Sequence, residues 1–273
     1  MKIAALIQGR MSSSRLPGKV MQDIAGKPML AWVVDRASRA HNLSQVAVVT
    51  SLETSDDSIA LFCQQQGYAC QRGSLHDVLD RYYQAARNLQ ADVIVRITAD
   101  CPLIDPGLVD ELLQAFLAGA KDGGAFDFGA NRLPPPWRRT YPIGLDVEVC
   151  TFTALERAWR EADQTFQREH VMPFLYEGLT PATDQPSRGE YVTPRGFRVL
   201  LQNHSVDYGS LRWTVDTPQD LELVRQIFAR FPGQDNFSWQ EVLELFTNEP
   251  ALARINAGVA AKHVQETDTR IRK

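Results

Sequence analysis

The sequence contains no long apolar segment and few cysteines, and these two absences exclude several classes of protein. No stretch approaches the roughly 20 consecutive apolar residues of a membrane helix. The four cysteines include no C-x-x-C pair, so we expect neither a zinc site nor a redox pair. The apolar run between Lys2 and Arg10 is too short for a signal peptide. We therefore expect a cytoplasmic protein without a membrane partner.

Two common phosphate-binding motifs and an excess of positive charge are also missing. The P-loop requires G-x-x-x-x-G-K-[ST] leading into a helix. Here eight residues separate Gly9 from Gly18, and Val20 follows Lys19. The dinucleotide fingerprint G-x-G-x-x-G does not occur. The formal net charge of −4 over 273 residues gives no support to nucleic acid as a partner.

A basic, hydroxyl-rich loop near the N-terminus stands out against this acidic background. Residues 3–7 are apolar and predict a buried strand over 3–8. Residues 10–19 then bring together two arginines, a lysine and three serines, with glycine at both ends of the loop. Arginine clamps oxygens in pairs, lysine supplies a point charge, and glycine allows close backbone approach. The loop suits a triphosphate; the alternative is a solvated basic loop.

Two aspartates follow predicted strands in distant parts of the chain. Asp100 comes just after an apolar run at 92–98, and Asp216 ends a second predicted strand at 211–215. Open α/β sheets bind ligands beyond the carboxyl ends of their strands. One or two carboxylates plus phosphate oxygens are the ligands that Mg²⁺ takes. We expect these aspartates to hold Mg²⁺, with helix capping as the alternative.

Alternating strand and helix patterns continue along the chain. Apolar runs predict strands at 3–8, 45–50, 92–98, 144–150, 197–202 and 211–215. Helical spacing and capping signals predict helices at 28–40, 56–66, 75–89, 106–118, 151–161, 168–176 and 218–230. This alternation favours an α/β fold with a doubly wound, largely parallel sheet.

A long segment at 119–148, rich in glycine, proline and arginine, breaks this alternation. Such a loop inside a compact domain is usually functional or disordered. We place an acceptor substrate here, in contact with Asn131, Asp146 and Glu148. Asp146 and Glu148 lie on one face of a predicted strand, where they would bind sugar hydroxyls or lie near the metal. The alternative is that they are two solvent-facing carboxylates on an edge strand.

We divide the chain into an α/β domain over 1–232 and a helical extension and tail over 233–273. The segment 119–148 is an insertion in the first part. Residues 181–196 are rich in proline, glycine, serine and threonine, and predict a small arm at a subunit contact of a homodimer.

Several of these segments resemble the cytidylyltransferases that activate acidic sugars. The pattern R-x-x-S-x-R-L-P-G-K at 10–19 is similar to the start of CMP-KDO synthetases, and residues 215–222 resemble their later metal motif. Four further segments resemble the subgroup named for spore coat polysaccharide biosynthesis protein F: 72–74, 77–83, 96–105 and 168–171. The resemblance covers residues 1–232. It implies a fold of the nucleotide-diphospho-sugar transferase type.

The resemblance also implies a reaction and a set of roles. CMP would pass from CTP to an acidic sugar, a sugar phosphate or a related acceptor, with release of pyrophosphate. The residues implied to be catalytic are Arg15, Lys19, Asp100 and Asp216, with the two aspartates on Mg²⁺. The implied nucleotide contacts are Gln8, Gly9, Arg10, Ser13, Arg15, Lys19, Arg72, Ser74 and Asp77. The implied acceptor contacts include Arg168, Glu169 and His170, for which a helix-start cluster is the alternative.

Two departures leave the base and the acceptor open. Gln8-Gly9 replaces the Pro-Ala of the KDO enzymes, and residues 72–82 differ from their version. Two other functions remain: a metal-dependent glycosyltransferase of the same fold and a non-catalytic nucleotide-binding protein. The first typically carries a D-x-D motif, which Asp100-Cys101-Pro102 lacks, and the intact candidate residues argue against the second.

Overall fold

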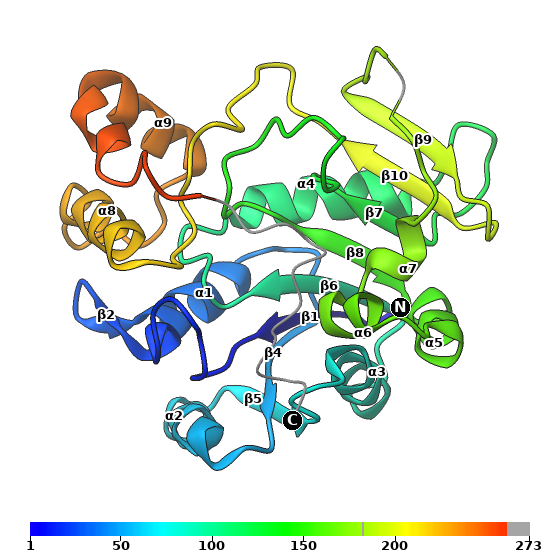
Figure 1. Ribbon diagram of the computed structural model, residues 1–273, viewed down its shortest axis with the longest axis horizontal. Coiled ribbons are helices and arrows are strands. Elements are labelled where there is room, and N and C mark those ends of the chain that lie inside the picture. Colours follow the sequence, from blue (N-terminus) through cyan, green and yellow to red (C-terminus); the bar gives the residue numbers. More distant parts are fainter. Residues whose placement is uncertain (182, 261–273) are drawn as a thin grey trace.

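An eight-stranded sheet forms the centre of the computed structural model, which describes residues 1–181 and 183–260 (Figure 1). Its strand order is β5-β4-β1-β6-β8-β7-β10-β9. The strands are β1 (Ile3–Gln8), β4 (Gln45–Ser51), β5 (Ala69–Gly73), β6 (Val93–Thr98), β7 (Phe128–Ala130), β8 (Glu148–Thr151), β9 (Arg188–Val192) and β10 (Arg198–Gln202). A two-stranded hairpin, β2 (Asp23–Ile24) and β3 (Lys27–Pro28), lies apart.

Helices follow most of the strands. They are α1 (Met29–Ala37), α2 (Asp57–Gln66), α3 (Val78–Asn88), α4 (Pro106–Leu117), α5 (Phe152–Glu161), α6 (Thr165–His170), α7 (Pro173–Tyr176), α8 (Pro218–Ala229) and α9 (Trp239–Asn248). The described residues also form short 3₁₀ helices: η1 (Lys19–Met21), η2 (Thr54–Asp56) and η3 (Pro250–Arg254). In the described part of the chain, no helix has the length and apolar character needed to span a bilayer.

The sheet is mostly parallel, as predicted. β5, β4, β1 and β6 pair in parallel, and so do β7 and β10. β8 is antiparallel to both β6 and β7, and β9 is antiparallel to β10. The chain passes from β1 to β4 on one side, and later returns to β6 on the other side of β1. This is a topological switch point, the place where open α/β sheets bind ligands.

Alternation along the strands builds a core on each face of the sheet. In β1, Ile3, Ala5 and Ile7 join the cluster that contains the apolar faces of α1, α4, α8 and α9. Ala4 and Leu6 point the other way, into the cluster formed with α3, α5 and α7. Helices therefore cover both faces, which is the three-layer arrangement that the βαβ pattern predicts (Figure 1).

The predicted strand at 211–215 is wrong. This segment is extended and buried at Trp213 and Val215, but among the described residues its pairing is limited to a single bridge between Arg212 and Ile143. Its amides donate to loops instead: Trp213 N to the Ile143 carbonyl at 2.7 Å, and Val215 N to the Asp100 carbonyl at 2.8 Å. The apolar side chains of this segment are buried because the segment crosses the ends of the strands, and not because it pairs within the sheet.

Two other predicted elements are shorter or broken. The strand expected at 144–150 begins only at Glu148, because Gly144 has a φ of +109° and the Leu145 amide turns back to the Pro142 carbonyl. The helix expected at 168–176 is split into α6 and α7 at Val171, whose φ is +73°. The strands β5, β7 and β9 are not predicted from the sequence. β9 lies inside the predicted arm, of which residue 182 is outside the described residues.

Candidate active site

The loops after β1 and β6 run side by side at the switch point. The Gln8 carbonyl accepts a hydrogen bond from the Ala99 amide at 2.8 Å, and the Gly9 amide donates to the Val49 carbonyl at 3.2 Å. A Cβ at Gly9 would lie 3.0 Å from the Ala99 Cβ. Only glycine fits this approach without a shift, so the residue sets the spacing between the two loops.

The basic loop folds back on itself and ends in a turn. The Gly18 amide donates to the Met11 carbonyl at 2.8 Å, and Gly18 has a left-handed φ of +69°. The Met11 amide in turn donates to the buried Asp56 carboxylate at 2.7 Å. This closure places the first residue of η1, Lys19, in the interior, where its side chain is 9% exposed. Arg10 and Ser13 stay half-buried in the loop.

The Lys19 ammonium joins the two candidate metal ligands. It donates to Asp100 Oδ2 at 2.6 Å, to Asp216 Oδ1 at 2.8 Å and to the Val215 carbonyl at 2.8 Å. Burial alone would lower the Lys19 pKa, but the two carboxylates outweigh it and raise the pKa. The ammonium is therefore charged, and the two aspartates, far apart in the sequence, meet at one cation.

Asp216 is held on its other oxygen by two arginines. Arg15 Nη2 and Arg212 Nη2 each lie 2.7 Å from Asp216 Oδ2. Burial favours the neutral acid, yet Lys19, Arg15 and Arg212 lower the Asp216 pKa to about 2. The carboxylate is thus ionised at neutral pH. Three cations converge on this one group, which is the charge pattern expected where phosphate oxygens also bind.

The start of α8 fixes the position of Asp216. Thr217 caps the helix, with Pro218 at the first helical position and Asp220 reaching back to the Thr217 amide at 3.0 Å. The same Asp220 Oδ2 accepts the Asp216 amide at 3.1 Å. Asp216 is therefore positioned by a helix cap rather than by the strand that the sequence suggested.

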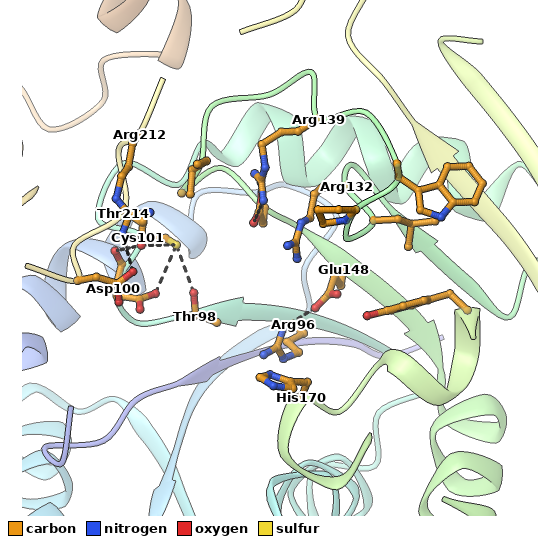
Figure 2. A pocket seen from close by; sticks show the side chains of 18 of the residues that line it. Arg96, Thr98, Asp100, Cys101, Arg132, Arg139, Glu148, His170, Arg212 and Thr214 are labelled. Carbon is orange, nitrogen blue, oxygen red and sulfur yellow. Dashed lines mark hydrogen bonds and ion pairs between the residues drawn. The ribbon is translucent and has the colours of Figure 1, made fainter. Parts of the chain in front are cut away.

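A cavity of about 440 Å³ is lined by both aspartates, and Figure 2 shows Asp100 on one side of it. Its lining contains the ends of β6 and β8, the loop 132–146 and the segment 212–216. Most of its charged groups are paired. Arg96 forms an ion pair with Glu148. Arg139 donates to Asp146 through both terminal nitrogens, with 2.9 Å between Nη2 and Oδ2.

The pair of Arg96 and Glu148 follows from strand register. These residues are directly opposite each other in the antiparallel pairing of β6 and β8. Burial would lower the Arg96 pKa, but the adjacent Glu148 carboxylate raises it. Asp146 is also ionised: burial would raise its pKa, whereas Arg139 and Arg132 lower it. The wall of the cavity is thus made of fixed, opposed charges.

Arg132 differs from the other arginines of the cavity. Within residues 1–181 and 183–260, it has no hydrogen-bond or ion-pair partner. Figure 2 shows its guanidinium reaching into the cavity from the loop, facing Glu148 and Arg96 on the sheet. A cation in this position can bind an anion without first breaking an internal ion pair.

Several predicted contacts lie outside the cavity lining. Asn131 is buried and bonds the backbone of Leu145 and Val147 through both ends of its amide. Arg168 pairs with Asp77, the N-cap of α3, at 3.1 Å from Nε. These contacts join neighbouring segments, and a ligand contact for each of the three stays a prediction.

Some of the remaining predicted contact residues line the cavity, and the others bond to neighbouring segments outside it. Arg72 bonds the Ser51 carbonyl at 2.8 Å and pairs with Asp57, and Ser74 Oγ accepts the Asp77 amide at 2.9 Å. His170 lines the cavity, whereas the half-buried Glu169 is not part of its lining. Gln8 Oε1 accepts Arg96 Nη2 at 3.3 Å.

Four arginines that line the cavity are not among the predicted site residues: Arg96, Arg132, Arg139 and Arg212. One signal was available for the first: a charged residue inside an otherwise apolar central strand needs a partner or a ligand. Arg132 and Arg139 belong to the loop that we assigned to the acceptor, but its basic character alone does not indicate which arginine is unpaired.

The donor set fits a hard divalent cation only in part. No group of three or more His, Cys, Asp or Glu side chains suited to a metal occurs among the described residues. Asp100 and Asp216 nevertheless bring carboxylate oxygens to one point, where the Lys19 ammonium now lies. Mg²⁺ is commonly bound through one or two carboxylates together with substrate phosphates, so these residues suit an ion that arrives with a nucleotide.

Comparisons with known proteins show the family to which this chain belongs. The family model described as Cytidylyltransferase matches residues 4–244. The 3-deoxy-manno-octulosonate cytidylyltransferase of Anaeromyxobacter dehalogenans is 38% identical over 241 residues, which are 83% of this chain and 98% of that protein. Spore coat polysaccharide biosynthesis protein SpsF of Bacillus subtilis is 27% identical over 256 residues, 92% and 96% of the two chains.

A solved structure supports the same conclusion. The structure of a cytidylyltransferase from Leptospira borgpetersenii superimposes with a TM-score of 0.81 at 28% identity, covering 96% of this chain and 100% of that one. Fold and site define an α/β protein of the nucleotidyltransferase type. More narrowly, the chain belongs to the cytidylyltransferase family, which confirms the resemblance stated from its sequence.

Proposed function

We propose that this protein transfers CMP from CTP to an acidic sugar, a sugar phosphate or a related acceptor, with release of pyrophosphate, in polysaccharide or surface-glycan biosynthesis. The observation that carries the proposal is the meeting of Lys19, Asp100 and Asp216 at the edge of a charged cavity. The names of its relatives support CTP as donor and a glycan pathway.

The phosphate side of the site consists of Arg15 and Lys19. An acceptor oxygen attacks the α-phosphorus of CTP, the new O–P bond forms, and the bond to the β-phosphate oxygen breaks. Negative charge grows on the departing pyrophosphate, and these two cations stabilise it. A Mg²⁺ ion held by Asp100 and Asp216 would supply additional charge neutralisation when bound.

The acceptor side of the site consists of the cavity wall. Arg132 is placed to bind a carboxylate, phosphate or phosphonate of the acceptor because it has no internal partner among the described residues. Asp146 and Glu148, each fixed by an arginine, are oriented to accept hydrogen bonds from hydroxyl groups. A cavity of about 440 Å³ falls within the range of small-molecule sites, ~300–1,000 Å³.

A pyrophosphate-release assay tests this function. The wild-type protein is incubated with each of the four NTPs and with a panel of acidic sugars, sugar phosphates, phosphonates and neutral sugars. We expect pyrophosphate only with CTP and an anionic acceptor. The panel also separates acceptors that attack through a hydroxyl, which needs a base, from those that attack through a phosphate, which does not. Transfer of a sugar from a preformed nucleotide sugar, without pyrophosphate, would contradict the proposal.

We also propose that the protein forms a homodimer through residues 181–196, which contain the edge strand β9. Val192 at the end of this strand is 62% exposed. Edge strands present unpaired backbone groups that a second chain can cover. Light scattering after size-exclusion chromatography tests this: a monomer at micromolar concentration would contradict it.

A further inference from the structure

The segment after α9 returns to the active site. It forms η3 and then a turn in which the Val259 amide donates to the Asn256 carbonyl at 3.0 Å. Further on, the Ala260 carbonyl accepts Arg15 Nη1 at 3.2 Å. The family match covers residues 4–244, so Arg15 lies inside it and Ala260 lies beyond it. The C-terminal segment therefore touches the basic loop directly.

Asn256 is the most buried polar residue of this segment, with 5% of its surface exposed. Its Nδ2 donates to Asp220 Oδ1 at 2.8 Å and to the Arg212 carbonyl at 2.9 Å. Asp220 is fully buried, and the same Oδ1 accepts Arg212 Nε at 2.9 Å. Arg212 Nη2 then donates to Asp216 Oδ2 at 2.7 Å. A continuous chain of hydrogen bonds thus runs from Asn256 to Asp216.

We infer that Asn256 is a positioning residue for Asp216, an inference that rests on the proposed function. Arg212 donates to Asp220 through Nε and Nη2 and to Asp216 through Nη2, so one guanidinium is shared between two carboxylates. Asn256 satisfies one of those carboxylates and also fixes the Arg212 backbone. Without its Nδ2, Asp220 would have only Arg212 as a side-chain donor to that oxygen, and would draw the guanidinium away from Asp216.

The consequence concerns the orientation of the Asp216 carboxylate. Oδ2 is held by Arg212 and Arg15, which leaves Oδ1 directed at Lys19 and the Asp100 side. Weakening the Arg212 contact lets the carboxylate rotate, so the oxygen needed for a shared cation is no longer fixed. Residues that orient the ligands of a metal affect its affinity or the activity by about 10–100-fold.

The test uses Asn256→Ala and Asn256→Asp in the full chain. The first removes the side-chain amide, and the second keeps its shape but removes the donor. We expect kcat to fall and the Mg²⁺ concentration for half-maximal activity to rise, each about tenfold, while the KM for the acceptor stays unchanged. Calorimetric titration of Mg²⁺ in the presence of a non-hydrolysable CTP analogue should show the same loss of affinity.

Asn203→Ala is the matched control. Asn203 is equally buried, at 4% exposed, and its Nδ2 donates to the Pro186 carbonyl at 3.0 Å, outside the cavity lining. Its loss should lower the thermal midpoint without changing the Mg²⁺ dependence. If Asn256→Ala fails to fold, Asn256→Ser provides a smaller donor at the same position and should restore part of the Mg²⁺ affinity.

Two outcomes are distinguishable. If both Asn256 variants bind Mg²⁺ and CTP as the wild type does, and differ from it only in thermal midpoint, the positioning role is overturned. If the wild type itself releases no pyrophosphate, the proposed function fails, and the titrations still decide whether Asn256 supports the Asp216 site.

Discussion

Replacing Lys19 with methionine separates the charge of this residue from its volume. The substitution leaves Asp100 and Asp216 facing each other without the ammonium that bridges them. Removing one partner of a buried ion pair costs about 3–5 kcal/mol. The carboxylates here are 23% and 21% exposed, so we expect about 3 kcal/mol, the lower end of that range. Urea unfolding at pH 7 measures this loss.

The pH dependence of unfolding gives a second readout. Burial raises the Asp216 pKa, but Lys19 and the arginines bring it down to about 2, from 3.8. A depressed pKa contributes stability that is present above pH 3.8 and is lost as the pH falls toward 2. In the wild type this amounts to about 2 kcal/mol. The loss between pH 5 and pH 2 should be smaller in Lys19→Met, because the largest depressing charge is gone.

Magnesium should affect the variant more than the wild type. In the wild type the Lys19 ammonium already contacts both aspartates, whereas in Lys19→Met a divalent ion has both carboxylates to itself. We expect Mg²⁺ to raise the thermal midpoint of the variant by several degrees more than that of the wild type. Turnover should fall by about 10²-fold or more, because stabilisation of the leaving pyrophosphate is lost. Wild-type stability together with wild-type kcat/KM in Lys19→Met would refute this reasoning.

Three further predictions concern the ligands. Arg132→Gln should raise the KM for the acceptor about 10–100-fold with little change in the KM for CTP, because only the acceptor anion loses a charged partner. Steady-state kinetics measure both constants. A raised KM for CTP with an unchanged KM for the acceptor would show that Arg132 does not bind the acceptor anion. EDTA should abolish activity, and Mg²⁺ or Mn²⁺ should restore it; activity that persists in EDTA would remove the metal from the proposal. CTP should be preferred over UTP by at least ~10²-fold, since a pocket that pairs the cytosine amino group rejects a base without it; equal binding of the two analogues in titrations would leave the base unassigned.

The sequence predicts the centre of the fold because the central strands are apolar and regular. β1 and β6 are read directly from their buried runs, and the helices between them from their spacing. The sequence does not predict β5, because this strand carries the polar residues Gln71 and Arg72. It does not predict β7 either, because that strand has only three residues. The predicted strand at 211–215 is wrong for a different reason. Trp213 and Val215 are buried because the segment packs against other loops, and an apolar composition does not distinguish such a segment from a strand that is hydrogen-bonded into a sheet.

The candidate site follows the same pattern. Lys19, Asp100 and Asp216 were each predicted from local sequence, but their convergence is a contact between three distant segments. Asn256 gives no local signal at all, because its role depends on Asp220 and Arg212, which lie in another segment. The sequence also does not indicate whether an arginine such as Arg132 has an ion-pair partner, because that depends on which residues the fold brings close to it.

The reversed direction of β8 separates the proposed nucleotide side of the cavity from its proposed acceptor side. Because β8 is antiparallel to β6, its first residue, Glu148, lies beside the carboxyl-terminal half of β6, and the loop 132–146 reaches the cavity before the strand begins. The β1 and β6 loops with Lys19 and Asp100 belong to the parallel half of the sheet. Residues 132–139 can therefore vary in sequence while the pairing of β6 and β8 stays in register, because the contacts of Ile143 with residues 211–214 lie outside that part of the loop. Exchanging residues 132–139 between relatives should shift acceptor preference without moving Asp216.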